Sequence, residues 1–224
     1  MSRVIAMDGP SGAGKSSVSR RVGQLLGFLH VDSGALYRIV TWQALEQQVD
    51  TADARAVAEL ARNLTIDCRP ENGRIVFRVG TLEPADQLRT PAVNAHASEV
   101  ARVQEVREQV TAVLRSLKRF GDLIVEGRDI TTAVFPDTPA RFYLDADPVE
   151  RARRRQLEER QKGIADQTLE AVKTSLLSRD RIDSTRACAP LRLVEGVRRI
   201  DSTHLTFEQV VQTVLSNLPE DWRA

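Results

Sequence analysis

The sequence predicts an α/β protein in which a mainly parallel sheet is flanked by helices. Short apolar runs alternate with longer stretches of helical periodicity, as they do in folds built from strand–helix–strand units. The first apolar run is followed at 9–17 by GPSGAGKSS and then by a helical pattern, which is the strand–loop–helix order of a phosphate-binding loop. A length of 224 residues suits one domain of this class.

Five apolar runs are the predicted strands, and together they would form a five-stranded parallel sheet. They occupy residues 4–7, 29–31, 123–125, 142–144 and 197–200, the last being the weakest because Arg198 and Arg199 interrupt it. Helices are predicted between them. One at 17–26 ends at Gly27, a second at 95–120 carries an apolar stripe, and a third at 148–162 is rich in charge and ends near Gly163.

One segment, LTIDCRPENGRIVFRVG, follows a different pattern. Apolar and polar residues alternate on either side of Asn72-Gly73, and alternation around Asn-Gly is the strongest local signal for a β-hairpin. The alternating apolar residues are Leu64, Ile66, Cys68, Ile75, Phe77 and Val79. We therefore expect a small antiparallel lobe at about 63–90, inserted into a core formed by about 1–62 and 91–224.

Composition and charge narrow the class of protein. The net charge is +1, so the protein as a whole does not attract nucleic acid electrostatically. Aromatic residues, on which the bases of single strands stack, make up only 4% of the chain and are not interleaved with its basic residues. No apolar run approaches the roughly 20 residues of a membrane span, and the apolar stretch near the N-terminus is short for a signal peptide. Cys68 and Cys188 form no Cys-x-x-Cys motif. These features predict a cytoplasmic protein that binds neither nucleic acid nor membranes.

The stretch at 9–17 contains the full Gly-x-x-x-x-Gly-Lys-Ser pattern of a P-loop. Its glycines allow backbone N–H groups to curl around an anion, and the following helix adds its N-terminal N–H groups and dipole. Lys15 is expected to reach the β- and γ-phosphates of a nucleoside triphosphate, and the Ser16 hydroxyl to ligate Mg²⁺. The predicted nucleotide-binding residues are Gly9, Pro10, Ser11, Gly12, Ala13, Gly14, Lys15, Ser16 and Ser17.

A second group of anion-binding residues follows the other predicted strands. DSGALYR (32–38), VEGRD (125–129) and DADPVERARRR (145–155) each come after an apolar run, and SRDRIDSTR (178–186) adds three arginines. Ligands of open α/β sheets bind beyond the carboxyl ends of the strands, so these motifs are expected to meet the P-loop there. Arg38, Arg128 and Arg186 are candidates for a second phosphate site. With no Asn-Lys-x-Asp guanine motif present, the pattern favours a phosphotransferase over a GTPase.

Arg107 lies within the apolar stripe of the helix predicted at 95–120, between Val103 and Val110. Burying an arginine there is costly unless the guanidinium has a partner. The pattern alone leaves two possibilities open. Either Arg107 points into a polar cleft, or it reaches the rim of the helix or forms a structural ion pair.

Four stretches of the sequence resemble the bacterial cytidylate kinases, a family of nucleoside monophosphate kinases. They are GPSGAGKSS, DSGALYR, VEGRDITTAVFPD and SRDRIDSTRACAPL, and the resemblance covers about residues 3–215. It implies a single P-loop kinase domain with a central five-stranded parallel sheet, a mobile monophosphate-binding lobe and a short lid at about 151–163. It also implies phosphorylation of CMP, and of dCMP, by ATP with Mg²⁺.

The resemblance implies a role for each candidate residue. The acceptor α-phosphate would be held by Ser11, Arg38, Arg128 and Arg186. The cytosine edge would be read by Ser98, Arg107 and Asp129. The sugar would meet Arg179 and Asp183, and the base and sugar pocket would be lined by Ser33 and Tyr37. The lid arginines that would close over ATP are Arg151, Arg154 and Arg155. The catalytic residues would be Lys15, Arg128, Arg154 and Arg186.

Two positions depart from the pattern of this family. Many members have Gly-Lys-Gly-Thr where this chain has Gly14-Lys15-Ser16-Ser17, so both serines are candidates for the Mg²⁺ ligand. Many members have Asp where this chain has Glu126, and the extra methylene could shift how water or metal is held.

Three alternatives fit the same motifs. The acceptor could be UMP or another small metabolite, the chain could sense nucleotide without turnover, or the Arg-rich run at 151–155 could bind RNA. Preference for cytosine rests on Asp129, because a carboxylate accepts a hydrogen bond from the cytosine amino group and repels the uracil carbonyl. A monomer is expected, since no exposed apolar stripe stands out.

Overall fold

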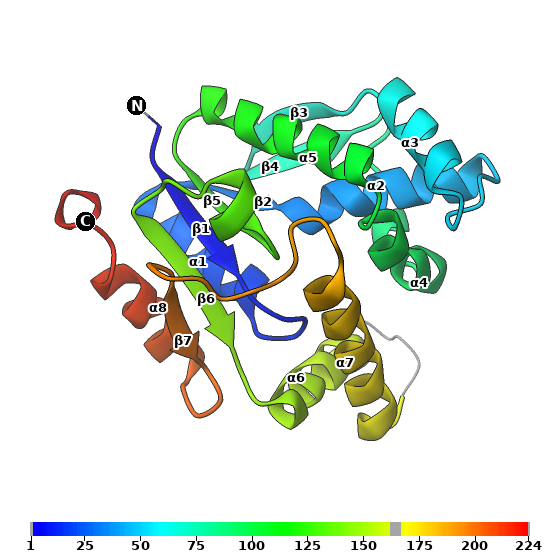
Figure 1. The fold of residues 1–224 in the computed structure, drawn as a ribbon. Helices are drawn as coiled ribbons and strands as arrows, with labels where there is room; N and C mark the ends of the chain where they lie inside the picture. The colour runs from blue at the N-terminus through cyan, green and yellow to red at the C-terminus, as the bar shows by residue number, and fades with distance from the viewer. Residues whose placement is uncertain (1, 162–166, 224) are drawn as a thin grey trace.

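Seven strands form one sheet with helices on both faces in the computed structural model, which describes residues 2–161 and 167–223 (Figure 1). The strand order is β3-β4-β2-β5-β1-β6-β7. The strands are β1 (Val4–Asp8), β2 (Leu29–Asp32), β3 (Asp67–Glu71), β4 (Arg74–Arg78), β5 (Leu123–Gly127), β6 (Ala140–Asp145) and β7 (Arg198–Asp201). The helices are α1 (Lys15–Leu26), α2 (Ser33–Glu46), α3 (Ala54–Asn63), α4 (Pro91–Val100), α5 (Gln104–Ser116), α6 (Pro148–Gln161), α7 (Leu169–Thr185) and α8 (Phe207–Ser216).

The strands β2, β5, β1, β6 and β7 run parallel, and β1 lies between β5 and β6. In the register of this region, Val4 pairs with Leu123 and Ile5 with Ala140. The carboxyl ends of these strands therefore lie along one edge of the sheet. The P-loop, the start of α2 and the turn after β5 all begin at this edge.

The predicted count of five strands is too low, because the hairpin joins the sheet. β3 and β4 pair antiparallel, and His30 of β2 pairs in parallel with Arg74 of β4. Asn72 and Gly73 have φ angles of 49° and 75°, as the predicted two-residue turn requires. Alternation of apolar residues identified the hairpin but carried no information about the strand beside it.

Side chains of the parallel strands alternate between two apolar cores, one on each face of the sheet. Val4 and Ala6 pack with residues of α2, α3 and α5, whereas Ile5 and Met7 pack with residues of α1 and α8. A parallel sheet covered on both faces reads as continuous apolar runs, which is why these strands were visible in the sequence.

The helices differ from the predicted ones mainly between 91 and 120. The single helix predicted at 95–120 is two helices, α4 and α5, because the backbone at Val103 is extended (φ −69°, ψ 121°). The carbonyl of Ala101, freed by this break, accepts a hydrogen bond of 2.9 Å from Arg107 Nη1. The predicted helix at 148–162 corresponds to α6, and residues 162 and 163 lie outside the described residues. Among the described helices, none has both the length and the apolar character needed to cross a membrane.

Gly9 begins the P-loop where it passes close to β6. A Cβ at this position would lie 2.0 Å from the carbonyl oxygen of Leu144, and φ is +147°. Gly9→Ala is therefore expected to lower the free energy of unfolding by about 3 kcal/mol, since backbone must move to admit the methyl group. Gly73→Ala is the matched control, because its φ is +75° and no heavy atom lies within 4 Å; it should cost about 1 kcal/mol. If urea unfolding showed the same loss of unfolding free energy in both variants, the close approach of Gly9 to β6 would not be the cause.

Candidate active site

The loops at the carboxyl edge of the sheet border a cleft of about 970 Å³. The P-loop, α2, α4, α6 and α7 all contribute to its lining. The predicted substrate-contacting residues that line it are Ser33, Tyr37, Arg38, Ser98, Arg128, Asp129, Arg179, Asp183 and Arg186. Arg107 does not line it, and neither do Gly9 and Pro10 of the predicted nucleotide-binding loop, whereas residues 11–17 do.

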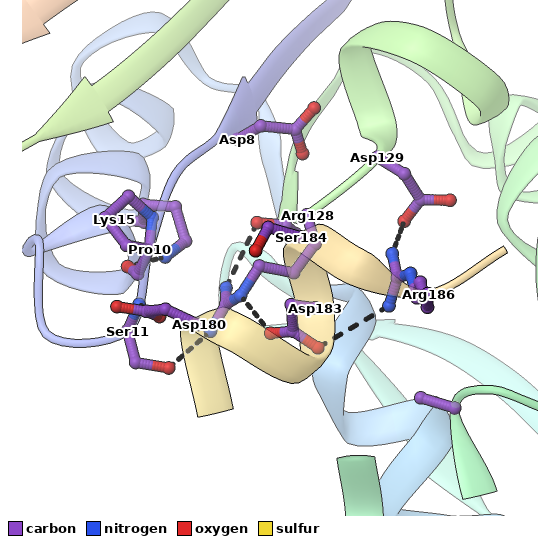
Figure 2. Close-up of polar contacts among 12 residues, drawn as sticks. Asp8, Pro10, Ser11, Lys15, Arg128, Asp129, Asp180, Asp183, Ser184 and Arg186 are labelled. Atoms are coloured by element: carbon purple, nitrogen blue, oxygen red, sulfur yellow. Dashed lines mark hydrogen bonds and ion pairs between the residues drawn. The ribbon is translucent and has the colours of Figure 1, made fainter. Parts of the chain in front are cut away.

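The P-loop connects β1 to α1 and holds its lysine against its own backbone (Figure 2). Gly12 and Gly14 have φ angles of 77° and 93°, which glycine adopts without strain. Lys15 is 6% exposed, and its Nζ donates to the carbonyl of Pro10 at 2.7 Å. Burial lowers the pKa of Lys15 to about 7, and the charge of Arg128 adds to this effect. An incoming anion therefore competes with one neutral acceptor for this ammonium group.

Ser16 belongs to a chain of three polar side chains. Its hydroxyl donates to Glu126 Oε2 at 2.9 Å, and His30 Nε2 lies 3.0 Å from Glu126 Oε1. Glu126 and His30 are buried, whereas Ser17, the other predicted candidate for the Mg²⁺ ligand, is exposed. His30 was not predicted, although a histidine within a short apolar run is a visible signal.

Arg128 joins the P-loop to α7 (Figure 2). Its Nη2 donates to Ser11 Oγ at 2.8 Å, and its Nε donates to Asp183 Oδ2 at 3.0 Å. Arg186 follows the end of α7, with its Nη1 3.6 Å from Asp183 and its Nη2 3.6 Å from Asp129. Two arginines and two aspartates therefore alternate, and each cation has an anionic neighbour.

Two further predicted arginines line the same cleft. Arg38 of α2 lies 3.8 Å from Asp32, and its Nε is buried with no hydrogen-bond partner among the described residues. The pKa of Arg179 is lowered to about 10, chiefly by burial and then by the charges of Arg38 and Arg128. The positive charges of Arg38, Arg128 and Arg179 repel one another, and an anion bound between them would relieve this repulsion. This arrangement favours a second phosphate site.

Arg107 forms the ion pair that was one of its two possible interpretations. It is 3% exposed, and its Nη2 donates to Asp129 Oδ2. Its Cζ lies 5.3 Å from the centroid of the Tyr37 ring. Asp129 and Tyr37 line the cleft and Arg107 does not, so Arg107 supports the cleft wall from behind these two residues. Its Nε has no hydrogen-bond partner among the described residues.

Asp8, the last residue of β1, was not predicted as part of the site. It is fully buried, and its carboxylate accepts hydrogen bonds from Ile130 N at 2.9 Å, Thr131 N at 2.8 Å and Thr131 Oγ1 at 2.6 Å. Burial raises its pKa to about 6, although these hydrogen bonds act in the opposite direction. The signal in the sequence was an acidic residue at the end of an apolar run. Asp8 holds the turn that follows Arg128 and Asp129.

Two of the three predicted lid arginines, Arg154 and Arg155, line the cleft, and the third, Arg151, does not. Arg151 is buried and does not line the cleft, because its guanidinium bonds to the carbonyl oxygens of Ser11 and Ala146 and to Asp180. Arg154 lines the cleft and donates to Glu150 and Ser202. The other two arginines of the run pair with acidic residues of α6, Arg153 with Glu150 and Arg155 with Glu158 and Glu159. A run neutralised in this way does not favour RNA binding.

The lining of the cleft also includes residues that were not predicted, six of which lie in α6 and in the segment from β7 into α8. They are Glu150, Leu157, Ser202, Leu205, Phe207 and Val210. Most of them follow β7, whose interrupted apolar run gave a weak strand signal. Ligands of open α/β sheets bind beyond the carboxyl ends of the strands, and applying this rule to β7 would have identified these residues.

Comparisons with known proteins agree on one family. A family model described as cytidylate kinase matches residues 5–220. A cytidylate kinase of Shouchella clausii (strain KSM-K16) is 39% identical over 220 residues, which cover 98% of this chain and 97% of that protein. A bifunctional pantoate ligase/cytidylate kinase of Prochlorococcus marinus (strain MIT 9313) is 40% identical over 213 residues, 95% of this chain. This chain spans less than half of that bifunctional protein, 42% of its length.

The crystal structure of an uncharacterized protein from Eubacterium ventriosum ATCC 27560 has a similar fold. Its TM-score is 0.50 at 9% sequence identity, and the match covers 96% of each chain. This likeness concerns the fold alone.

The lowered pKa of Lys15 predicts a pH dependence of polyphosphate binding. The free lysine loses its proton as pH rises through about 7, whereas a bound anion favours the charged form. The affinity for inorganic tripolyphosphate, measured by calorimetry, should therefore fall by about tenfold per pH unit above 7. In Lys15→Arg the guanidinium stays charged, so this dependence should disappear. Lys118→Arg, an exposed lysine, is the control and should behave as the wild type. If the affinity fell with pH equally in the wild type and in Lys15→Arg, deprotonation of Lys15 would not be the cause of the pH dependence.

Proposed function

The chain belongs to the cytidylate kinase family, and we propose that it transfers the γ-phosphoryl group of ATP to CMP and dCMP, releasing ADP with CDP or dCDP. The observation that carries the proposal is the presence of two cationic phosphate sites in one cleft. The P-loop with Lys15 is one, and the cluster of Arg38, Arg128 and Arg186 is the other. A nucleotide sensor requires only the first site, whereas transfer between two polyanions requires both.

The donor occupies the P-loop side of the cleft. Lys15 and the amide groups of the loop hold the β- and γ-phosphates. The part of the cleft lined by α6 and by the segment from β7 into α8 receives the adenosine, where Arg154 is fixed by hydrogen bonds of 2.9 Å and 2.7 Å to Ser202 and where Leu205 and Phe207 supply apolar surface. Arg154 keeps its proposed role beside the donor phosphates, and Arg151 does not.

The acceptor occupies the side of the cleft between α2, α4 and α7. Its phosphate is bound by the arginine cluster with Ser11, and its sugar by Arg179 and Asp183. Arginine suits the phosphate because its planar fork bonds two oxygens and stays charged at any physiological pH. Ser33 and Tyr37 line the pocket for base and sugar.

The base is recognised at Asp129. Its carboxylate accepts from the exocyclic amino group of cytosine, and Arg107 behind it fixes its orientation. Ser98 of α4 lines the same cleft and supplies a further polar contact. Uracil presents a carbonyl oxygen instead of the amino group. With UMP, the Asp129 carboxylate would keep Arg107 as its partner but would face a second acceptor instead of a donor on the base.

Magnesium fits the P-loop end of this site. Ser16 and Glu126 offer oxygen atoms only, and among the described residues no group of three or more His, Cys, Asp and Glu side chains is placed to hold a metal ion. Mg²⁺ is commonly bound through one or two protein oxygens, water and substrate phosphates, so this donor set is suitable. Ser16 would hold it, with Glu126 oriented by His30 close by. When bound there, the ion would supply positive charge that offsets the negative charge of the donor phosphates.

The chain's own residues then act by positioning and by charge. The attacking oxygen of CMP is already anionic, so no strong general base is needed. Lys15, Arg128 and Arg186, with Arg154 from α6, offset the repulsion between the two polyanions and stabilise the charge of the loose transition state. Exclusion of water by the lobe at about 63–90 and by the lid stays a prediction, as do the monomeric state and the cytoplasmic location.

The acceptor panel is the direct test of the proposed function. ADP formation is measured with Mg-ATP and CMP, dCMP, UMP, AMP or GMP in parallel. CMP or dCMP should exceed UMP in kcat/KM by about 100-fold or more, because UMP sets a carbonyl oxygen against the buried carboxylate of Asp129. Equal turnover of UMP would exclude Asp129 as the base-reading residue. Turnover of none of the five acceptors would favour a nucleotide sensor.

Asp129→Asn separates base recognition from donor binding. The variant places an amide donor against the cytosine amino group, so kcat/KM for CMP should fall by about 100-fold, whereas the Kd for ATP should stay within about twofold. Glu108→Gln, an exposed substitution one residue from Arg107 on α5, is the control and should retain both constants. Thermal melting confirms that each variant is folded at the assay temperature. An equal loss of CMP turnover and ATP affinity would show that Asp129 supports the fold or the donor site instead.

A further inference from the structure

One ion pair binds both backbone groups of a single P-loop residue. Asp180 of α7 accepts from the amide of Ser11 at 2.9 Å, and Arg151 of α6 donates to the carbonyl of Ser11 at 3.0 Å. Arg151 and Asp180 also bond to each other, and Arg151 Nε donates to Ala146 O at 3.0 Å. Figure 2 places Asp180 next to Ser11. The loop is therefore held between the two helices that follow β6.

The location of Asp180 is unfavourable for simple charge reasons. A carboxylate beside an anion-binding loop repels phosphate by Coulomb interaction. Asp180 is close enough for its charge to raise the pKa of Lys15 in that loop. Its side chain is 15% exposed and that of Arg151 is 6% exposed, so solvent screens the pair poorly. A carboxylate in this position therefore needs a role that outweighs its repulsion of phosphate.

That role follows from what Ser11 connects. Its hydroxyl accepts from Arg128, and Arg128 in turn donates to Asp183, which lies one turn after Asp180 on α7. Ser11 is therefore bound through its amide, its carbonyl and its side chain. Any shift of the loop against α6 and α7 would disturb the arginine proposed to hold the acceptor phosphate.

Arg151 is not free to leave this position for a nucleotide. Its guanidinium is bonded to three oxygen-bearing partners, two of them backbone carbonyls. The helix itself lies against the loop, since a Cβ on Gly12 would stand 3.0 Å from the Arg151 carbonyl oxygen. Movement of a lid would have to begin beyond Arg151, toward Arg154 and Arg155.

We propose that Arg151 and Asp180 are positioning residues that fix the P-loop against α6 and α7 and hold it in the shape that receives phosphate. They contact neither nucleotide. The inference rests on the proposed function only in taking the loop as the ATP-phosphate site. The opposite possibility is that Asp180 restrains Arg151 until ATP arrives and Arg151 then moves onto the phosphates.

The test is the affinity of Arg151→Met, Asp180→Asn and the double variant for ATP and for inorganic tripolyphosphate, measured by calorimetry well below the melting temperature. Each single variant should weaken both ligands about tenfold, and the double variant should be no more than about twofold weaker than either, because the two side chains act as one unit. The sign for Asp180→Asn is diagnostic. Removal of a negative charge would tighten anion binding if charge alone mattered, so weaker binding reports a change in loop geometry.

Arg3→Met and Asp122→Asn are the matched controls. They break an ion pair of 2.7 Å at the opposite edge of the sheet and should leave both affinities unchanged. Unchanged or tighter binding by Asp180→Asn would overturn the proposal, as would a fall in melting temperature with unaltered affinity. Failure of the wild type to bind either ligand would instead refute the proposed function on which the inference rests.

Discussion

Asp8 ends β1, and its buried carboxylate accepts three hydrogen bonds from the turn that follows β5. The same strand continues directly into the P-loop, whereas the turn carries Arg128 and Asp129. One side chain therefore ties the strand that enters the P-loop to the turn that carries Arg128 and Asp129. Phosphoryl transfer depends on how such elements are spaced, since misplacement of reacting groups by about 1 Å can cost about 100-fold in rate. The remaining contacts of Arg128, to Ser11 and Asp183, are built on a backbone that is already fixed.

Arg128 and Arg186 of the cleft are balanced by carboxylates of the same chain. Asp183 pairs with Arg128 and lies near Arg186, and Asp129 lies near Arg186 and pairs with Arg107 behind the cleft wall. Uncompensated cations in such a place would cost several kcal/mol each, so these aspartates allow a cationic site to exist in the free protein. In the proposed complex, a phosphate would bind Arg128 and Arg186, and Asp183 and Asp129 would then face the sugar and the base. The roles proposed for the two aspartates are therefore compatible with their pairing in the free protein.

The features that could be predicted from the sequence are those determined by neighbouring residues. The P-loop and the Asn72-Gly73 turn each depend on a few adjacent residues. The seven-stranded sheet depends on partners far along the chain, such as Arg74 beside His30. The break at Val103 has a shorter-range partner, since Arg107 bonds to the carbonyl of Ala101, but the apolar periodicity of the segment gave no sign of it. The Arg-rich run at 151–155 was equally ambiguous, because spacing cannot tell which arginine meets a helix across the loop. Asp180 decided that outcome, and Asp180 is 29 residues away from Arg151.

The ionised form of Asp8 costs stability, and this cost helps to explain its role. Burial raises its pKa from 3.8 to about 6, so the folded protein binds this proton more tightly than the unfolded chain does. This tighter proton binding stabilises the folded protein fully below about pH 4, and the stabilisation is lost as pH rises through about 6. Relative to the acidic form, the free energy of unfolding at neutral pH is therefore lower by on the order of 3 kcal/mol because of Asp8. An amide of the same shape would avoid the charge. However, its N–H₂ group would oppose one of the donors of Ile130 and Thr131, whereas a carboxylate accepts from all of them. The geometry that Asp8 imposes on Arg128 and Asp129, rather than a gain in stability, therefore accounts for a buried carboxylate at the end of β1.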